Sequence, residues 1–107
     1  MSAVTRIEVL GFAGCPNTEP TVALVRRIVS SAGVVASVER IEVGTQQQAE
    51  LLRFLGSPTV RINGRDVEPD ADARNNYVFA CRIYDTPAGP SGVPDERWLR
   101  EALSGAA

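Results

Sequence analysis

The turn at residues 11–18, with the sequence GFAGCPNT, most constrains how this chain can fold. Before it, residues 4–10 alternate between apolar and charged side chains, which predicts a β-strand. After it, residues 19–32 repeat apolar side chains at three- and four-residue intervals, which predicts an amphipathic helix closed by Gly33. Cys15 therefore lies where a strand meets a helix, and the free N–H groups and dipole of a helix N-terminus stabilise a thiolate.

The sequence leaves two starts open for this helix. Thr18 is a good N-cap, with Glu19 in the first turn and Pro20 tolerated there. Cys15 can instead cap a helix that begins at Pro16, because the N–H that proline lacks would be unpaired at that position. The second start makes Cys15 more acidic, but Pro20 then removes a hydrogen bond one turn into the helix.

The middle of the chain predicts a second strand and a second helix. Residues 34–43 are rich in β-branched side chains, and a slip in their alternation indicates a bulge near Glu39. Thr45 and Gln48 have the spacing of a capping box, which predicts a short helix that ends at Gly56. The buried stripe of this helix is predicted to consist of Leu51, Leu52 and Leu55.

The last third of the chain contains a hairpin, an insertion-like segment and a closing helix. Residues 57–67 predict a hairpin, because Asn63 followed by Gly64 is the strongest short-range turn signal. Residues 77–84 predict a strand with loops on either side. A helix anchored by apolar side chains is expected over about residues 94–103.

Composition predicts one globular domain over residues 1–107, with ordinary apolar and charged contents of 44% and 22%. A formal net charge of −2 gives no field that attracts nucleic acid or an anionic membrane, so neither partner is expected. No apolar run is long enough for a signal peptide or a membrane span. We therefore expect a cytoplasmic protein, whose thiols are kept reduced.

Two absent residue types restrict the chemistry further. The chain has no histidine, and all of its basic side chains are arginine. Histidine general bases, Cys-His pairs and Schiff-base lysines are therefore excluded, which leaves thiol and carboxylate chemistry. Two cysteines are too few for a four-ligand zinc site, so we assign no metal ligands there, although two thiolates suit a soft, two-coordinate metal ion.

These residues resemble the thioredoxin/glutaredoxin superfamily over about residues 4–69. A strand leads into a glycine turn with a Cys-Pro-x-x motif, and an x-Pro-Thr-Val-x-Ile-x-Gly hairpin follows. The resemblance implies a thioredoxin-like α/β fold with a central mixed sheet flanked by helices, in the order β-α-β-α-β-β-insertion-α. It also implies that Pro58 is cis and that Ser57, Pro58 and Thr59 form a substrate-binding loop beside Cys15. Pro16 and Thr18 complete the implied substrate-binding set.

The chain departs from the dithiol members of that superfamily. Its motif is CPNT, so Thr18 stands where a resolving cysteine would be. The second cysteine, Cys81, lies in the insertion-like segment at about residues 70–93. Because Cys81 alternates with Phe79 and Ile83, the pattern favours a core position, but it is also the one other thiol that can resolve a mixed disulfide.

Other functional residues also have a structural interpretation. Cys15 can be a small buried apolar residue, and Thr18 can be a simple N-cap or can donate its hydroxyl proton to the Cys15 thiolate. Five carboxylates are expected to form a solvated acidic rim, unless one lies in the cleft and transfers a proton. They are Asp66, Glu68, Asp70, Asp72 and Asp85.

Three functions fit these residues. In a thiol-disulfide oxidoreductase or thiol transferase, Cys15 attacks a disulfide or oxidised sulfur of a protein or small molecule, and Cys81 or an external thiol such as glutathione resolves the product. A weaker resemblance to short thioredoxin-like proteins labelled alkylmercury-lyase-like implies that Cys15 and Cys81 bind mercury or copper(I). The lyase's own local motifs are missing, so no aspartate is assigned to it. The third function is a non-catalytic thioredoxin-like interaction module.

Overall fold

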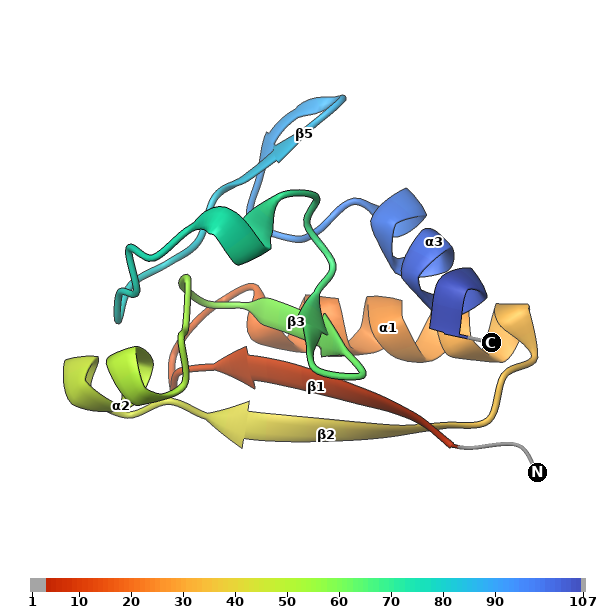
Figure 1. The fold of residues 1–107 in the computed structure, drawn as a ribbon, viewed down its shortest axis with the longest axis horizontal. Coiled ribbons are helices and arrows are strands. Elements are labelled where there is room, and N and C mark those ends of the chain that lie inside the picture. The colour runs from red at the N-terminus through yellow and green to blue at the C-terminus, as the bar shows by residue number, and fades with distance from the viewer. Residues whose placement is uncertain (1–3, 107) are drawn as a thin grey trace.

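A four-stranded sheet runs in the order β2-β1-β3-β4 through the computed structural model, which describes residues 4–106 (Figure 1). Its strands are β1 (Thr5–Gly11), β2 (Ala36–Glu42), β3 (Thr59–Ile62) and β4 (Arg65–Asp66). Strand β2 is parallel to β1, whereas β3 is antiparallel to both β1 and β4. The prediction of an α/β fold with a central mixed sheet is therefore confirmed.

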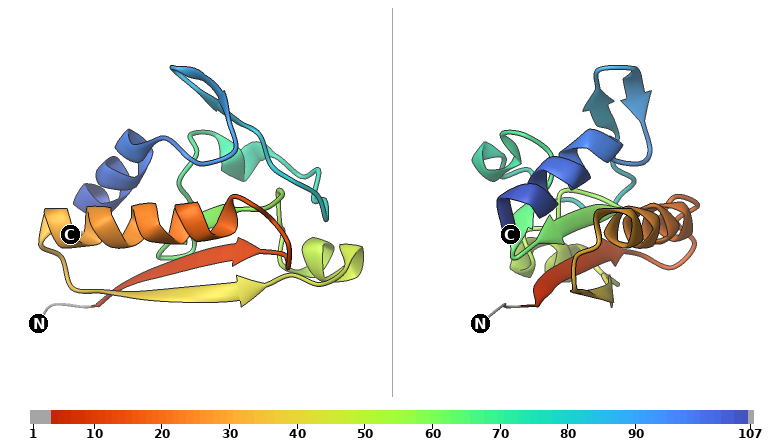
Figure 2. Two further views of the ribbon diagram at one scale, coloured as in Figure 1. Left: turned by 180° about the vertical axis from the view of Figure 1, so that it is seen from behind. Right: turned by 90° about the vertical axis from the view of Figure 1, so that its right-hand side faces the viewer.

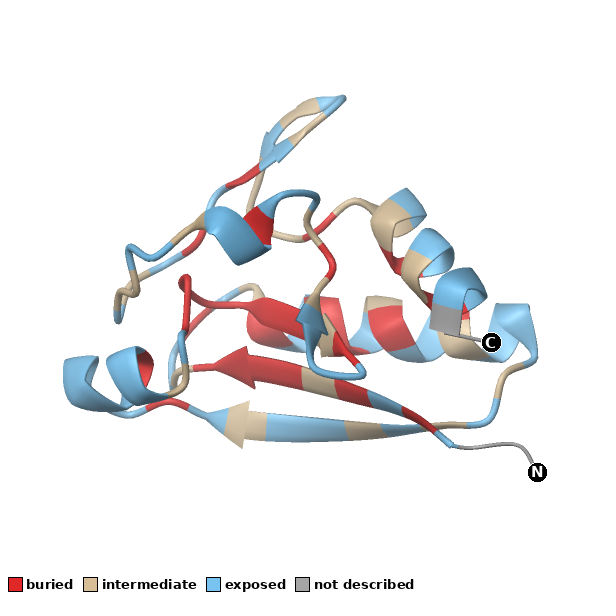
Figure 3. Cartoon of the chain, in the orientation of Figure 1, coloured by how far each residue is buried: buried red, intermediate tan, exposed pale blue. Residues whose placement is uncertain are grey.

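Helices α1 (Thr18–Ala32) and α3 (Glu96–Ala106) lie side by side on one face of this sheet (Figure 2). Cross-strand pairing aligns Ile7 with Ile62 and Val9 with Val60, so four apolar side chains face these helices. Fully burying each such side chain contributes about 1.5–3 kcal/mol. The helices add Val22, Val25, Ile28, Leu99 and Leu103 to this core, and Figure 3 shows the buried positions along β1, β3 and α1.

Helix α1 begins one to two residues away from the predicted starts. Asn17 is its N-cap, and the Asn17 carbonyl accepts the N–H of Thr21 at 3.1 Å without a side-chain cap. Pro16 and Asn17 form a turn before the helix, so neither Thr18 nor Cys15 is the N-cap. The predicted end is confirmed, because Gly33 has a left-handed φ of 68°.

Helix α2 (Gln46–Leu51) lies at the carboxyl ends of β1 and β2 (Figure 1). One half of the capping box is confirmed, because Thr45 Oγ1 accepts the Gln48 N–H at 3.0 Å. The return bond goes one residue further back, where Gln48 Oε1 accepts the Gly44 N–H at 2.6 Å. The predicted end at Gly56 is wrong. The helix ends at Leu51, Arg53 takes a left-handed φ of 54°, and the Arg61 guanidinium binds the carbonyls of Leu52 and Arg53. Leu51, predicted to be buried, is 77% exposed.

A second apolar cluster joins α2 to the sheet end. It consists of Leu10, Val43, Ala49 and Phe54.

The predicted bulge near Glu39 is wrong, because β1 and β2 pair residue for residue from Thr5 with Ala36 to Gly11 with Glu42. The slip in alternation has another cause: Arg40 lies on the helix-covered face of an edge strand, where it is exposed and pairs with Glu19.

The insertion-like segment contains a 3-10 helix, η1 (Ala71–Ala73), and a hairpin of β5 (Tyr84–Thr86) and β6 (Gly89–Ser91) that projects from the body (Figure 1). The predicted strand over residues 77–84 is wrong, since the extended chain there makes one isolated bridge, between Cys81 and Ser57. The predicted loop after it is instead the β5–β6 hairpin. In the part of the chain described, no helix is both long and apolar enough to cross a membrane.

Candidate functional site

Cys15 lies in the loop between β1 and α1 and is only 9% exposed. Its N–H donates to the Phe12 carbonyl at 3.2 Å, which closes a tight turn before the helix. Pro16 follows it on the exposed surface. The junction of strand and helix therefore holds the thiol beside the first turn of α1.

Two buried hydroxyls lie next to this thiol. Thr18 Oγ1 and Ser57 Oγ are 3.3 Å apart, although 39 residues separate them in the chain. Ser57 Oγ also accepts the Phe12 N–H at 3.4 Å. One of the two hydroxyls donates to the other, and the second keeps its proton for another acceptor.

These donors set the acidity of Cys15. Burial raises the pKa of the thiol, but hydrogen bonds from the Ser57 and Thr18 hydroxyls and from the N–H groups of Asn17 and Thr18 outweigh burial. The pKa of Cys15 therefore lies below its ordinary value. A lower pKa enlarges the thiolate population, which is the nucleophilic form. Thr18 is not the N-cap of α1, and its hydroxyl is one of the groups that lower the pKa of Cys15.

Gly11 is a part of this site that sequence reasoning missed. A Cβ at Gly11 would lie 2.6 Å from Thr18 Oγ1 and 3.0 Å from Ser57 Oγ. Such distances are too short for a side chain, so the two hydroxyls need the bare backbone of β1 behind them. The only signal in the sequence is a glycine at the end of a strand, which also fits a simple turn.

The peptide bond between Ser57 and Pro58 is cis. Hydrogen bonds from neighbouring segments hold the loop around it in place. The Ser57 N–H donates to the Ala80 carbonyl at 2.8 Å, and the Arg82 N–H donates to the Ser57 carbonyl at 2.9 Å. The Tyr84 hydroxyl donates to the Pro58 carbonyl. Thr59 Oγ1 donates to the Gly56 carbonyl at 2.6 Å.

Cys81 is exposed, so the pattern that favoured a core position was wrong. Its backbone pairs with Ser57, whose hydroxyl is one of the groups that lower the pKa of Cys15. Phe79, at a bend in the same segment, places its ring 5.2 Å from that of Phe12, between centroids. The segment that carries Cys81 therefore contacts Ser57 and Phe12, and both thiols are free.

Arg82 explains why this segment turns Cys81 outward. Its buried guanidinium donates to Asp66 at 2.8 and 3.1 Å, to Glu68 at 2.7 Å and to Thr59 Oγ1 at 3.0 Å. The same group lies 4.3 Å from the centre of the Tyr84 ring. Arg82 and Tyr84 therefore face inward, and Cys81 and the 64%-exposed Ile83 face outward.

Two of the five predicted rim carboxylates are not on the rim. Asp66 and Glu68 are largely buried against Arg82, and Glu68 also accepts from Arg74 at 2.9 Å. The alternation of Arg82 and Tyr84 opposite Phe79, Cys81 and Ile83 was visible in the sequence, but nothing local indicated which side is buried. The other three rim carboxylates, Asp70, Asp72 and Asp85, are exposed as predicted.

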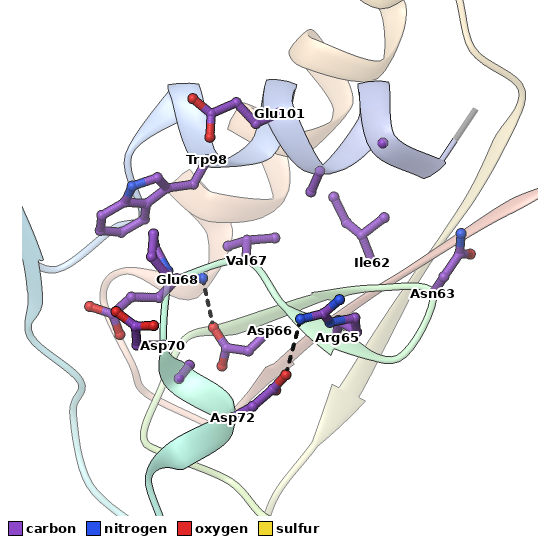
Figure 4. Close-up of a pocket in the computed structure, with 14 residues that line it drawn as sticks. Ile62, Asn63, Arg65, Asp66, Val67, Glu68, Asp70, Asp72, Trp98 and Glu101 are labelled. Carbon is purple, nitrogen blue, oxygen red and sulfur yellow. Dashed lines mark hydrogen bonds and ion pairs between the residues drawn. The ribbon is translucent and has the colours of Figure 1, made fainter.

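Two of the larger pockets flank these elements, and a third, of about 170 Å³, lies beside Arg61 and Tyr77. One, of about 440 Å³, is lined by Cys15, the loop before it and the end of β2. The other, of about 490 Å³, lies between the β3–β4 hairpin and α3, with Trp98 on one side and carboxylates on the other (Figure 4). Its lining includes neither cysteine, and arginines already bind Asp66, Glu68 and Asp72. Of these two pockets, the one of about 440 Å³ is the one that a cysteine lines.

Within residues 4–106, no group of three or more Cys, Asp or Glu side chains is arranged to hold a metal ion. No protein-family model, curated protein or solved structure matches the chain. Functional assignment therefore depends on the chemistry of the Cys15 site itself.

Proposed function

We propose that the protein is a thioredoxin-like thiol-disulfide oxidoreductase, with Cys15 as its nucleophile and Cys81 as its resolving thiol. One observation carries the proposal: Cys15 lies just before α1, beside the paired hydroxyls of Thr18 and Ser57, and these donors lower the pKa of its thiol. The cis Pro58 loop beside the thiol and the strand-turn-helix that carries it support the same assignment.

The reaction begins with the Cys15 thiolate attacking one sulfur of a substrate disulfide. A mixed disulfide forms, and the other half of the substrate leaves as a thiolate that takes a proton from water. The Cys81 thiolate then attacks the Cys15 sulfur and releases the second half. The substrate has gained two electrons, and the protein has been oxidised from two thiols to one disulfide.

An external thiol returns the protein to its starting state. Two molecules of glutathione or another small thiol reduce the Cys15–Cys81 disulfide and are themselves oxidised to a disulfide. A reducing cytoplasm would maintain this supply. In this scheme Ser57 and Thr18 stabilise the thiolate. Pro58 and Thr59, whose side chains are fully buried, keep Ser57 in place and do not contact the substrate.

The test is disulfide exchange with 2-hydroxyethyl disulfide by the wild type and two single variants. Cys15→Ser should abolish exchange, because the nucleophile is lost. Cys81→Ser should retain the first step and accumulate a mixed disulfide on Cys15, which intact mass spectrometry detects. Full activity of the Cys15→Ser variant would refute the proposal.

A further inference from the structure

We infer that the Cys15 cleft accepts low-molecular-weight disulfides of the amino-acid type, which carry carboxylate and ammonium groups, and not extended polypeptides. This inference rests on the proposed thiol chemistry and specifies its substrate. It combines two observations that the proposed function does not use: the occupied backbone of Ser57 and the charged side chains around the cleft.

An extended peptide binds beside a strand by exchanging backbone hydrogen bonds with a free edge. At Ser57 the backbone groups of that edge already have partners. Its N–H and its carbonyl are both bonded to the protein's own chain, at Ala80 and Arg82. The ion pairs of the buried Arg82 side chain hold this segment in place, so a peptide could pair with Ser57 only by breaking that network.

The route left to Cys15 is the cleft between the β1–α1 loop and the end of β2. Its volume of about 440 Å³ is in the usual range for small-molecule sites, about 300–1,000 Å³. Phe12, Ala13 and Gly14 line it on the loop side, and Gly14 is exposed. A disulfide with short substituents fits such a space, whereas a folded protein does not.

Charged side chains at this cleft indicate what those substituents carry. Arg40 pairs with Glu19, and Glu42 lies nearby in the same lining. Both partners of the ion pair are more than half exposed, so solvent screens their attraction and Arg40 can turn to another anion at little cost. Its guanidinium can bind a ligand carboxylate through two hydrogen bonds, while Glu19 and Glu42 remain for an ammonium group.

The experiment compares the rates of Cys15 oxidation by cystine, by uncharged 2-hydroxyethyl disulfide and by insulin as a protein disulfide. Arg40→Gln should slow the reaction with cystine about tenfold, the effect of one charge-assisted contact. The rate with 2-hydroxyethyl disulfide should stay within about twofold. Arg26→Gln, on the exposed side of α1, is the matched control and should change neither rate.

The outcomes separate the two proposals. No reaction with any of the three disulfides would overturn the thiol function itself. Reaction with 2-hydroxyethyl disulfide, but an unchanged cystine rate in Arg40→Gln, would overturn only the role of the cleft. Reduction of insulin as fast as cystine would overturn the exclusion of polypeptides.

Discussion

The β1–α1 loop and the segment around Cys81 meet at Ser57, but different forces hold them. Neutral hydroxyls, backbone N–H groups and the bare backbone of Gly11 surround the thiol of Cys15. A buried ion network, centred on Arg82, holds the Cys81 segment. Each neutral donor lowers the pKa of a thiol by a small amount. A buried charge without a partner, in contrast, costs a large amount of folding free energy.

Neutral donors suit a reactive thiol, and a buried ion network suits a segment that must keep one side inward. A thiolate whose pKa falls too far becomes a weaker nucleophile, so several modest hydrogen bonds suit Cys15 better than a full positive charge. A buried ion pair adds little net stability but is costly to break, so it determines which side of the Cys81 segment faces inward. We therefore expect substitutions in the Arg82 network to affect stability, and those around Cys15 to affect reactivity.

Arg82→Leu should have the largest effect. It leaves Asp66 buried without a cation and Glu68 with Arg74 alone, which is expected to cost about 3–5 kcal/mol of unfolding free energy. Urea unfolding measures this loss. The matched control is Arg65→Leu, which breaks the exposed pair with Asp72 and should cost at most about 1 kcal/mol. Equal losses in the two variants would show that the Arg82 network does not anchor the segment.

Gly11→Ala should have the next largest effect, and it acts on both stability and reactivity. The new Cβ would collide with the hydroxyls of Thr18 and Ser57, and overpacking of this type costs about 1–3 kcal/mol. Displaced hydroxyls should also raise the pKa of Cys15, measured by alkylation across pH. The control is Gly105→Ala in α3, where a Cβ meets nothing within 4 Å and should stabilise the helix slightly. An unchanged Cys15 pKa in Gly11→Ala would contradict the packing argument.

Ser57→Ala should act mainly on reactivity, with a loss of about 1 kcal/mol of unfolding free energy because the Phe12 N–H loses its acceptor. It removes one donor to the thiolate, and a hydrogen bond to a charged group contributes about 1.5 kcal/mol, so alkylation at pH 7 should slow about tenfold. Iodoacetamide kinetics with mass spectrometry of the Cys15 peptide provide the measurement. Ser91→Ala, at the β5–β6 hairpin, is the control. If Ser57→Ala alkylates as fast as the wild type, the hydroxyl does not stabilise the thiolate.

The pH dependence of stability should be the smallest effect. Because the pKa of Cys15 is lowered in the folded state, the unfolded state binds more protons between that lowered value and the ordinary thiol value of about 8.5. The unfolding free energy contributed by Cys15 should therefore rise with pH across this window and be absent below it. Cys15→Ser should remove the rise, and a wild type and variant with parallel pH profiles would contradict the lowered pKa.

Local interactions made several elements predictable from sequence. The Thr45–Gln48 capping box, the Asn63–Gly64 turn and the Gly33 cap each involve residues within four positions of one another. The same holds for the junction that places Cys15 before α1. The mixed sheet followed from two strand patterns and a hairpin, because their apolar sides must share one core.

Long-range contacts decided the rest. An alternating segment such as residues 77–84 has two equivalent sides. Which side turns inward depends on the side chains that the rest of the fold places against it. Here Asp66 and Glu68, 16 and 14 residues before Arg82, accept its guanidinium. Arg82 is therefore buried and Cys81 is exposed. Pairing between distant residues, which leaves no periodic signal in the chain, placed the backbone of Cys81 next to that of Ser57.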